Sequence, residues 1–208
     1  SHLAHNDFSD SSRPNYNIDT SSYEITEEHA GLSALGVKAI IRINDLGAVV
    51  DVSQLSRTAT LQTISLSRSP VIASHSNVQA ITNVTRNLSD HEIDQIGNSG
   101  GVIHIAAFGA YLVDLSKQET LNAIKAVRLK HSLPKAYSYP YELYWELPDA
   151  DSKRTFLVEM RDVIGAGNVQ DMANHIDYIV DRIGIDHVGI GNDFNHGSGI
   201  QGYADASE

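Results

Sequence analysis

The sequence contains no cysteine, and this absence limits its chemistry. Without thiols the protein can form no disulfide framework, no thiolate nucleophile and no cysteine-ligated zinc site, so a tightly bound metal ion must use His, Asp or Glu. The ten histidines are enough for that purpose. The lack of disulfides does not separate cytosol from periplasm, and we leave the location open, with a periplasmic or secreted one preferred to a cytoplasmic one.

Basic residues are also scarce. Fifteen Lys and Arg stand against twenty-six Asp and Glu, which gives a formal net charge of −11. Because the positive potential that attracts a phosphate backbone is missing, nucleic acid is not an expected partner. No apolar run approaches the ~20 residues of a membrane-spanning helix, and the start of the chain lacks the basic and apolar parts of a signal peptide. We therefore expect no membrane-spanning segment.

Helix and strand patterns alternate along the chain, whose 208 residues, 41% of them apolar, are enough for one large domain with a buried core. The clearest helix is 169–183, where apolar residues recur on one face, followed by Gly184 as a C-cap and a short apolar strand at 187–193. The same order recurs at 32–46 and 48–52, at 58–67 and 70–74, and at 89–96, with a Ser89–Glu92 capping box, and 102–108.

This alternation predicts a parallel sheet covered by helices, either closed into a barrel or open and doubly wound. No glycine-rich phosphate fingerprint opens a helix, which disfavours the nucleotide-binding open sheet. We therefore predict an α/β fold of the TIM (β/α)8 barrel type, one domain over 1–208. Only five strands can be counted, including a short one before His5, and eight strand–helix pairs usually need ~200 to 250 residues. We expect an incomplete barrel with a gap between about residues 8 and 23.

Polar residues follow three of the predicted strands, at 51–54, 74–76 and 192–193. Functional groups of barrels gather at such strand ends. His75 is a candidate metal ligand there, and a solvent-facing imidazole in a helix N-cap region is an equally good interpretation. Asp193 could act as a general base or metal ligand, although an Asp that starts a loop turn is commoner.

Two other groups could carry chemistry. His5 and Asp7 are two residues apart, so on an extended strand their side chains point to the same side and can bind one cation. Such a triplet also arises often by chance. Arg86 precedes a predicted helix and could bind a carboxylate with its guanidinium, although a solvated loop arginine is the default.

Several short motifs occur in one order along the chain. They are Ala4-His-Asn-Asp7, Glu28-His-Ala-Gly-Leu-Ser33, Asn44-Asp-Leu-Gly47, Val50-Asp-Val-Ser53, Pro70-Val-Ile-Ala-Ser-His-Ser76, Arg86-Asn-Leu88, Gly100-Gly-Val102, His175-Ile-Asp177 and Gly184-Ile-Asp-His-Val-Gly-Ile-Gly-Asn-Asp-Phe194. In this order and spacing the chain resembles the membrane dipeptidase (renal dipeptidase) family, peptidase family M19. The resemblance covers the opening triplet and nearly everything from Gly31 onward.

The resemblance implies a (β/α)8 barrel with two zinc ions bridged by a water or hydroxide that attacks the peptide bond of a dipeptide. By matching position, His5 and Asp7 would bind one zinc ion and His75 the other. Arg86 would bind the terminal carboxylate of the substrate, and Asp193 would accept a proton from the bridging water and pass it to the leaving amine. Paired cations can ionise water near neutral pH and stabilise the anionic intermediate.

The chain departs from the family pattern in three places. Gln54 stands where the family has a metal-binding histidine, and a neutral amide is a poorer zinc ligand than imidazole, so one zinc ion is expected to be weak or absent. The segment that supplies the family's metal-bridging Glu and a substrate-contacting His has no counterpart. Glu24, Glu27 and Glu28 lie too close to the Gly-Leu-Ser motif to replace that Glu, and Asn195 stands where the family has Asp.

Two alternatives to a zinc-dependent dipeptidase stay open. One is a barrel with impaired catalysis that serves as a binding or accessory protein, and the other is a related amidohydrolase that acts on another short amide or ester. A dipeptide or similar small molecule is the expected partner, and a homodimer is compatible with the sequence.

Other histidines are not expected to bind metal ions. We expect His175 and His187 to have structural roles, His104 to be a hydrogen-bonded interior residue and His131 to be solvated. The aromatic segment 137–145 is expected to be a packed loop.

Overall fold

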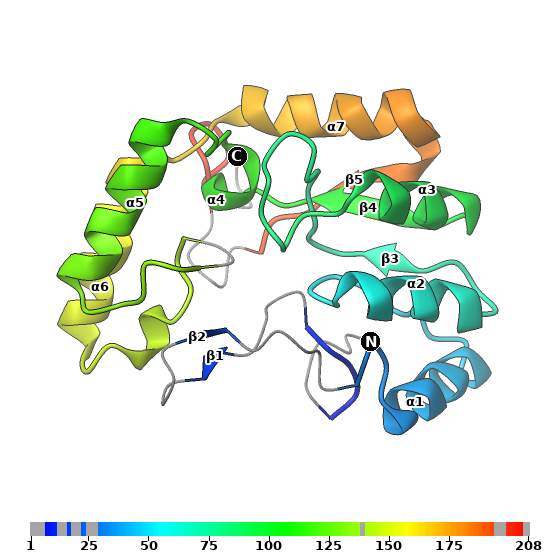
Figure 1. The fold of residues 1–208 in the computed structure, drawn as a ribbon. Coiled ribbons are helices and arrows are strands. Elements are labelled where there is room, and N and C mark those ends of the chain that lie inside the picture. Colours follow the sequence, from blue (N-terminus) through cyan, green and yellow to red (C-terminus); the bar gives the residue numbers. More distant parts are fainter. Residues whose placement is uncertain are drawn as a thin grey trace.

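A computed structural model describes residues 7–11, 16–17, 22–23, 29–137, 140–193 and 199–205. Its centre is a three-stranded parallel sheet in the order β3 (Ile72–Ala73), β4 (Val102–Ile105) and β5 (Val188–Ile190) (Figure 1). The predicted strand 48–52 is not a full strand, but it joins β3 through one parallel bridge between Asp51 and Ile72. The predicted parallel arrangement is therefore confirmed for four consecutive segments.

Four helices pack beside these segments in the same order. They are α1 (Ala34–Asp45), α2 (Arg57–Leu66), α3 (Asp90–Asn98) and α7 (Val169–Ile183). Each helix contacts the next, and α3 and α7 also contact the sheet. Helices and sheet share one apolar core, in which Ile40, Ile93, Ile103 and Ile179 are fully buried. The strands and the helices thus follow one another in the same order, as in an open arc of consecutive β/α units.

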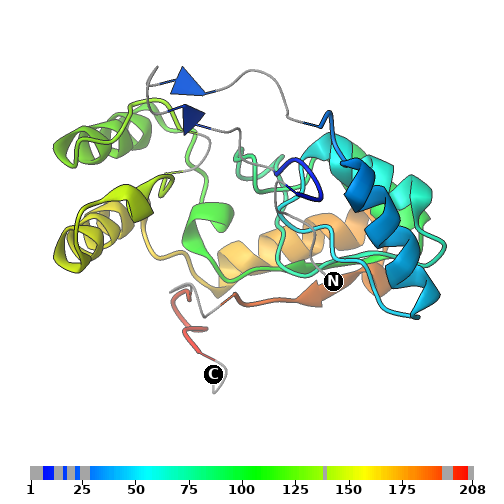
Figure 2. The same ribbon diagram turned by 90° about the horizontal axis from the view of Figure 1, so that it is seen from below.

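A second apolar cluster consists of residues between β4 and α7 in the sequence, together with Val84 from the loop before α3. It is built from α4 (Gly109–Leu112), α5 (Gln118–Lys130), α6 (Ala150–Ile164) and the loop between α5 and α6, which contains the 3-10 turn η1 (Tyr144–Glu146). Figures 1 and 2 both show α5 and α6 side by side, at the opposite end of the molecule from α1 and α2. The remaining elements are the 3-10 turn η2 (Ile185–His187) and an antiparallel pair, β1 (Tyr16–Asn17) and β2 (Ser22–Tyr23).

Two predicted helix ends are confirmed in detail. Helix α7 has the predicted bounds, and Gly184 ends it with φ +100°, a conformation that disfavours side chains with a Cβ. Helix α3 begins with the predicted capping box, in which Ser89 accepts from the Glu92 amide and the Glu92 carboxylate accepts from the Ser89 amide.

The predicted buried face of α1 is wrong in part. Leu35 and Leu46 belong to the apolar residues of the predicted helix 32–46, yet they are 51% and 64% exposed, whereas Gly36, Ile40 and Ile43 are buried. The reason is a close approach of backbones, because a Cβ at position 36 would lie 2.0 Å from the carbonyl oxygen of Phe8. The helix packs through its glycine, which rotates the leucines outward.

The described residues do not close into a barrel, since they form three paired strands and one bridge. The eight-stranded closure predicted from the sequence is therefore not part of the observed arrangement. The strand predicted before His5 lies outside the described residues. So does most of the segment between about residues 8 and 23, where a gap was predicted.

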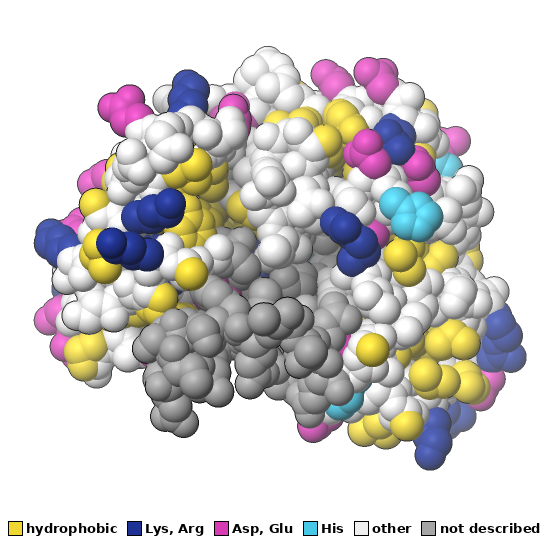
Figure 3. Space-filling model, viewed as in Figure 1, with side chains coloured by type: hydrophobic (Ala, Val, Ile, Leu, Met, Phe, Trp, Pro, Cys, Tyr) yellow, Lys and Arg dark blue, Asp and Glu magenta, His cyan; other side chains and the backbone are white. Residues whose placement is uncertain are grey.

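On the described part of the face seen in Figure 3, Lys and Arg lie scattered among Asp and Glu. Within the described ranges, none of the helices combines the length and the apolar character needed to cross a membrane.

Candidate metal site at the carboxyl ends of the strands

Parallel pairing brings the ends of β3, β4 and β5 to one edge of the sheet. His75 follows β3 at this edge, and Asp193 follows β5. The two strand ends approach closely, because a Cβ at Gly191 would lie 2.7 Å from the carbonyl oxygen of Ser74. Glycine at position 191 therefore allows the segment that carries Asp193 to pass beside the segment that carries His75.

A short chain of hydrogen bonds holds His75. The Ser74 hydroxyl lies 2.5 Å from Asp51 Oδ2 and 2.7 Å from His75 Nδ1. The other Asp51 oxygen, Oδ1, accepts from the amides of Ser53 at 3.0 Å and Ser74 at 3.1 Å. The Asp51 carboxylate is thus fixed by two backbone donors and in turn orients the Ser74 hydroxyl.

The hydrogen bonds of Ser74 determine which ring nitrogen of His75 carries the proton. A carboxylate only accepts, so the single hydroxyl proton of Ser74 is donated to Asp51. The Ser74 oxygen then accepts from Nδ1–H of His75, and Nε2 keeps its lone pair. This is the arrangement in which an outer hydrogen bond on one ring nitrogen orients the other nitrogen for a metal ion.

The side chain of Gln54 is hydrogen-bonded to the other ring nitrogen of His75, Nε2. Its amide nitrogen, Nε2, lies 2.7 Å from His75 Nε2 and is the donor, because the ring nitrogen has no proton to give. The residue that departs from the family pattern is thus in direct contact with the predicted ligand.

A buried pair of hydroxyls supports the backbone under this site. Ser53 Oγ accepts from the His75 amide at 3.0 Å and lies 2.8 Å from Ser76 Oγ. Both serines are almost fully buried. The amide of Ser76 donates to the carbonyl of His104 on β4 at 3.0 Å, so the position of His75 is tied to the central strand.

Arg86 lies on the loop between β3 and α3 and is buried, with 9% of its surface exposed. Asn77 ties the start of this loop to the segment after β4, through hydrogen bonds with the amide and carbonyl of Ala106 at 2.7 and 3.1 Å. Asn87 ties its end to α4, donating to the carbonyl of Tyr111 at 2.9 Å. The loop therefore carries Arg86 at the same edge as His75.

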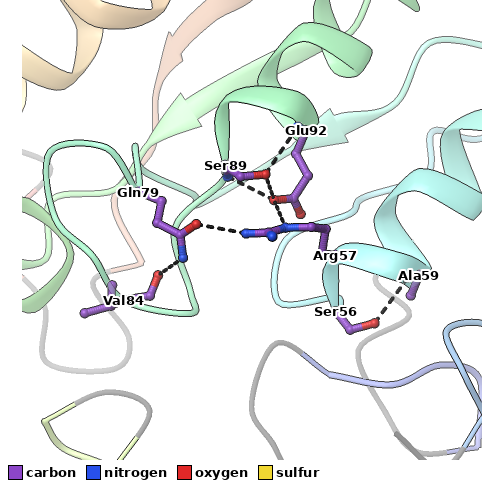
Figure 4. Close-up of polar contacts among 7 residues, drawn as sticks. All are labelled: Ser56, Arg57, Ala59, Gln79, Val84, Ser89 and Glu92. Atoms are coloured by element: carbon purple, nitrogen blue, oxygen red, sulfur yellow. Dashed lines mark hydrogen bonds and ion pairs between the residues drawn. The ribbon is translucent and has the colours of Figure 1, made fainter.

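Figure 4 shows how helices α2 and α3 hold the same loop. Arg57, the first residue of α2, donates to the Gln79 side-chain oxygen at 2.9 Å and contacts the Glu92 carboxylate at 3.4 Å. Gln79 in turn donates to the carbonyl of Val84 at 3.3 Å. These contacts connect the loop that carries Arg86 to the beginnings of two helices.

Asp7 lies in a segment held by backbone contacts to other loops. Its carbonyl accepts from Ser33 Oγ at 2.7 Å, and Asp10 bonds to the amide of Gly31 at 2.7 Å with its carboxylate. The side chain of Asp7 is exposed. His5 lies outside the described residues. The assignment of His5 and Asp7 to one metal ion stays a prediction.

Asp193 has a left-handed backbone, with φ +61°, and its side chain is partly buried. This conformation is uncommon for non-glycine residues, and Asp adopts it more readily than most. It turns the chain directly after the close approach at Gly191. The role of Asp193 in proton transfer is not tested by this geometry and stays a prediction.

Two of the histidine interpretations are confirmed and one is wrong. His175 is fully buried, accepts from the Val78 amide at 3.0 Å and donates to the Leu112 carbonyl at 3.1 Å, while His187 lies 2.8 Å from the Gly101 carbonyl, so both are structural. His131 was expected to be solvated. Its side chain is only 11% exposed, because it packs edge-on against Phe156 and bonds to Glu159 at 3.0 Å.

The donor set fits a metal ion in part. His75 offers an imidazole nitrogen in the state that metal ions require. Among the described residues, however, no group of three His, Asp or Glu side chains is placed to hold an ion. His75 therefore fits as one ligand of one ion, and the binding of a second ion by His5 and Asp7 stays a prediction.

The sequence did not reveal the roles of Asp51 and Ser74. Both were noted only as polar residues after strands, and neither was assigned to the site. The bridge between Asp51 and Ile72 places the two strand ends side by side, and no pattern in the sequence shows that these two segments pair.

The fold and the site place the chain among the parallel α/β proteins whose functional polar groups lie at the carboxyl ends of the strands. Within this class, the chain belongs to the membrane dipeptidase family, peptidase family M19, whose model matches residues 1–208. The predicted resemblance is thereby confirmed.

Known relatives agree with this assignment. The chain is 26% identical to Dipeptidase aclJ of Aspergillus oryzae, over 100% of the chain and 36% of that relative. It superposes on the crystal structure of the probable dipeptidase PvdM from Pseudomonas aeruginosa with a TM-score of 0.77 and 36% identity, covering 100% of the chain and 53% of that protein.

A metallo peptidase from Rhodobacter sphaeroides, liganded with a phosphinate mimic of the dipeptide L-Ala-D-Ala, shares the fold with a TM-score of 0.57 and 24% identity. The match covers 84% of the chain and 37% of that structure. The chain thus spans between about a third and about half of the length of these relatives.

Proposed function

We propose that the protein containing this chain is a metal-dependent dipeptidase, which hydrolyses the peptide bond of a dipeptide or similar short amide. The observation that supports this most directly is His75 at the end of β3. Asp51 and Ser74 hold its ring so that the Nε2 lone pair faces away from them. Membership of the membrane dipeptidase family supports the same activity.

The complete fold of this proposal is a (β/α)8 barrel, of which the described strands and helices form an arc. His75 would bind one zinc ion, and His5 with Asp7 would bind a second. Zinc, when bound, supplies a Lewis acid that activates water near neutral pH and stabilises developing negative charge. Gln54, in place of the family's histidine, would leave the ion at His75 more weakly held.

Two residues of the chain would act on the substrate. Arg86 would bind the terminal carboxylate of the dipeptide, for which a guanidinium offers a bidentate partner. Asp193 would accept a proton from the attacking water and return it to the leaving amine. The loop contacts of Asn77 and Asn87 support a place for Arg86 at the strand ends, and the close approach at Gly191 supports one for Asp193.

Hydrolysis of a dipeptide and of the same dipeptide as its C-terminal amide tests this proposal in the full-length protein. We expect cleavage of the free dipeptide that a chelator abolishes and added zinc restores. Arg86→Met should raise KM for the free dipeptide and leave KM for the amide unchanged, with thermal unfolding as the check on folding. A metal-loaded protein that cleaves no dipeptide would contradict the proposal.

Gln54 favours a second candidate, a barrel with impaired catalysis that serves as a binding or accessory protein. Its amide occupies the lone pair that a metal ion would use. Protein that takes up no zinc and shows no turnover would favour this candidate. Cleavage of a lactone in place of the dipeptide would instead indicate a related amidohydrolase that acts on another short ester or amide.

A further inference from the structure

The hydrogen bond from Gln54 to His75 is accepted by the Nε2 lone pair, which is the lone pair that His75 would offer to a metal ion. His75 Nδ1 is already bonded to Ser74, which leaves Nε2 as the nitrogen open to a second partner. The Gln54 amide fills that place at 2.7 Å. One lone pair cannot serve an amide proton and a cation together.

The backbone around Gln54 is fixed on both sides. On one side, the Ser53 amide is bonded to Asp51 Oδ1 at 3.0 Å. On the other, Leu55 is buried and its amide donates to the Val52 carbonyl at 3.2 Å. Gln54 itself has φ +70°, in the left-handed region. The side chain therefore starts from a fixed turn next to His75.

We propose that Gln54 is an internal competitor for metal ions, which holds the Nε2 lone pair of His75 in the metal-free protein. This rests on the proposed function in so far as it takes His75 to be a metal ligand. A cation must break the Gln54 hydrogen bond before it binds. Since the amide carries no charge and donates a proton here, it opposes the ion where an imidazole at position 54 would bind it.

The size of the effect follows from the net strength of one hydrogen bond. Loss of a neutral hydrogen bond typically changes an equilibrium by about fivefold. Removal of the competing amide should therefore tighten zinc binding at His75 by about fivefold. An imidazole at position 54 removes the competitor and adds a ligand, so its gain should be larger than that of removing the amide alone.

Zinc titration of the metal-free, full-length protein by calorimetry tests the proposal. Gln54→Leu keeps most of the side-chain volume and removes the donor, and Gln54→His supplies a ligand. Gln118→Leu is the matched control, because Gln118 is exposed on α5 and its side-chain amide donates to Asn122 at 2.9 Å. We expect tighter binding in both Gln54 variants and no change in the control.

Nitrogen NMR of the His75 ring in the metal-free protein gives a second readout. Gln54→Leu should shift the resonance of Nε2 and leave the proton on Nδ1, because Ser74 and Asp51 are untouched. An unshifted resonance would show that the Gln54 amide does not bond to Nε2, and would overturn the proposal.

The outcomes separate the competitor from the proposed dipeptidase. If the wild type binds zinc and cleaves dipeptides but Gln54→Leu binds zinc equally or more weakly, Gln54 is a bystander or a ligand, and the competitor is overturned alone. If Gln54→Leu tightens zinc binding and no loaded variant cleaves dipeptides, the competitor stands and the dipeptidase falls. If no variant binds zinc, both fail.

Discussion

Ser74 connects the Asp51 carboxylate to the imidazole of His75. Replacing it by alanine removes both hydrogen bonds of the hydroxyl, so the proton of His75 is no longer held on Nδ1. Loss of such an outer partner typically lowers metal affinity by about 10- to 100-fold. We expect Ser74→Ala to weaken zinc binding within this range and to give a mixture of His75 tautomers by nitrogen NMR.

The matched control for Ser74 is Ser65→Ala on α2, whose hydroxyl is exposed and bonds to the Gln62 carbonyl. It should leave zinc binding unchanged. Equal zinc affinity in Ser74→Ala and the wild type would mean that the Asp51–Ser74 pair does not orient His75 for a metal ion.

His175 makes the stability of the fold depend on pH. Burial of the ring lowers the pKa of His175 from 6.5 to about 4. The hydrogen bond to the Leu112 carbonyl and the nearby charge of Asp171 raise this pKa, but by less than burial lowers it. Between these values the unfolded chain binds more protons than the folded one, so stability falls as the pH falls. The stability that the neutral, buried His175 contributes is fully present above about pH 6.5, and about 3 kcal/mol of the free energy of unfolding is lost by about pH 4.

Urea unfolding at a series of pH values measures this loss. His175→Gln should lower the free energy of unfolding at pH 7 and remove this part of its pH dependence. The exposed His91→Gln on α3 should keep the dependence of the wild type. A wild-type slope that survives in His175→Gln would assign the effect to other groups.

At the scale of elements, the start of α3 is a junction between two helices and a loop. The Glu92 side chain, only 6% exposed, accepts from the Ser89 amide at 2.9 Å and from Arg57 at 3.4 Å. Arg57 is 57% exposed on its side chain, so water screens its part of the ion pair. The cap should therefore matter more than the ion pair.

We expect Glu92→Ala to lower the free energy of unfolding by about 1 to 2 kcal/mol, because it opens the capping box and leaves the Ser89 amide unsatisfied. Arg57→Ala should cost less than about 1 kcal/mol. Chemical denaturation of the two variants gives both values. A larger loss in Arg57→Ala would show that the contact with the loop through Gln79 outweighs the helix cap.

The loop between α5 and α6 depends on one buried arginine. Arg128 is fully buried on α5 and donates to the carbonyls of Pro134, Pro140 and Glu142 at 2.7 to 2.9 Å. Its guanidinium also lies 5.3 Å from the centre of the Tyr137 ring. Because a guanidinium can serve several carbonyls at fixed angles, the ammonium of lysine cannot replace it.

Arg128→Lys should lower the free energy of unfolding by about 2 to 3 kcal/mol, since at least one buried carbonyl loses its donor. Amide hydrogen exchange should rise in the α5–α6 loop before it rises in the β-sheet. The control Lys130→Arg changes an exposed residue of the same helix and should have an effect within about 0.5 kcal/mol. Unchanged exchange in Arg128→Lys would contradict the assigned role.

At the scale of the whole molecule, the sequence predicted those elements whose apolar residues follow one period between clear end signals. Helix α7 and the capping box of α3 are examples. The helices α5 and α6 were not predicted. Their apolar side chains face each other and the aromatic loop in a separate cluster, so a core built around a single sheet gives no reason to expect them.

The site divides in a similar way. His75, Arg86 and Asp193 were proposed from their place after strands and from the family motifs. The hydrogen bonds of Asp51, Ser74 and Gln54 could not be predicted, because they depend on strand pairing and on the left-handed turn at Gln54. Patterns along the chain do not contain that information.

The proposed activity depends on His75 as a metal ligand. Anomalous diffraction at the zinc absorption edge, from crystals of the full-length protein grown with zinc, tests it most directly. We expect a peak at about 2.0 to 2.1 Å from His75 Nε2, with the Gln54 amide displaced from that nitrogen. Zinc bound elsewhere, with Gln54 still bonded to His75, would contradict it.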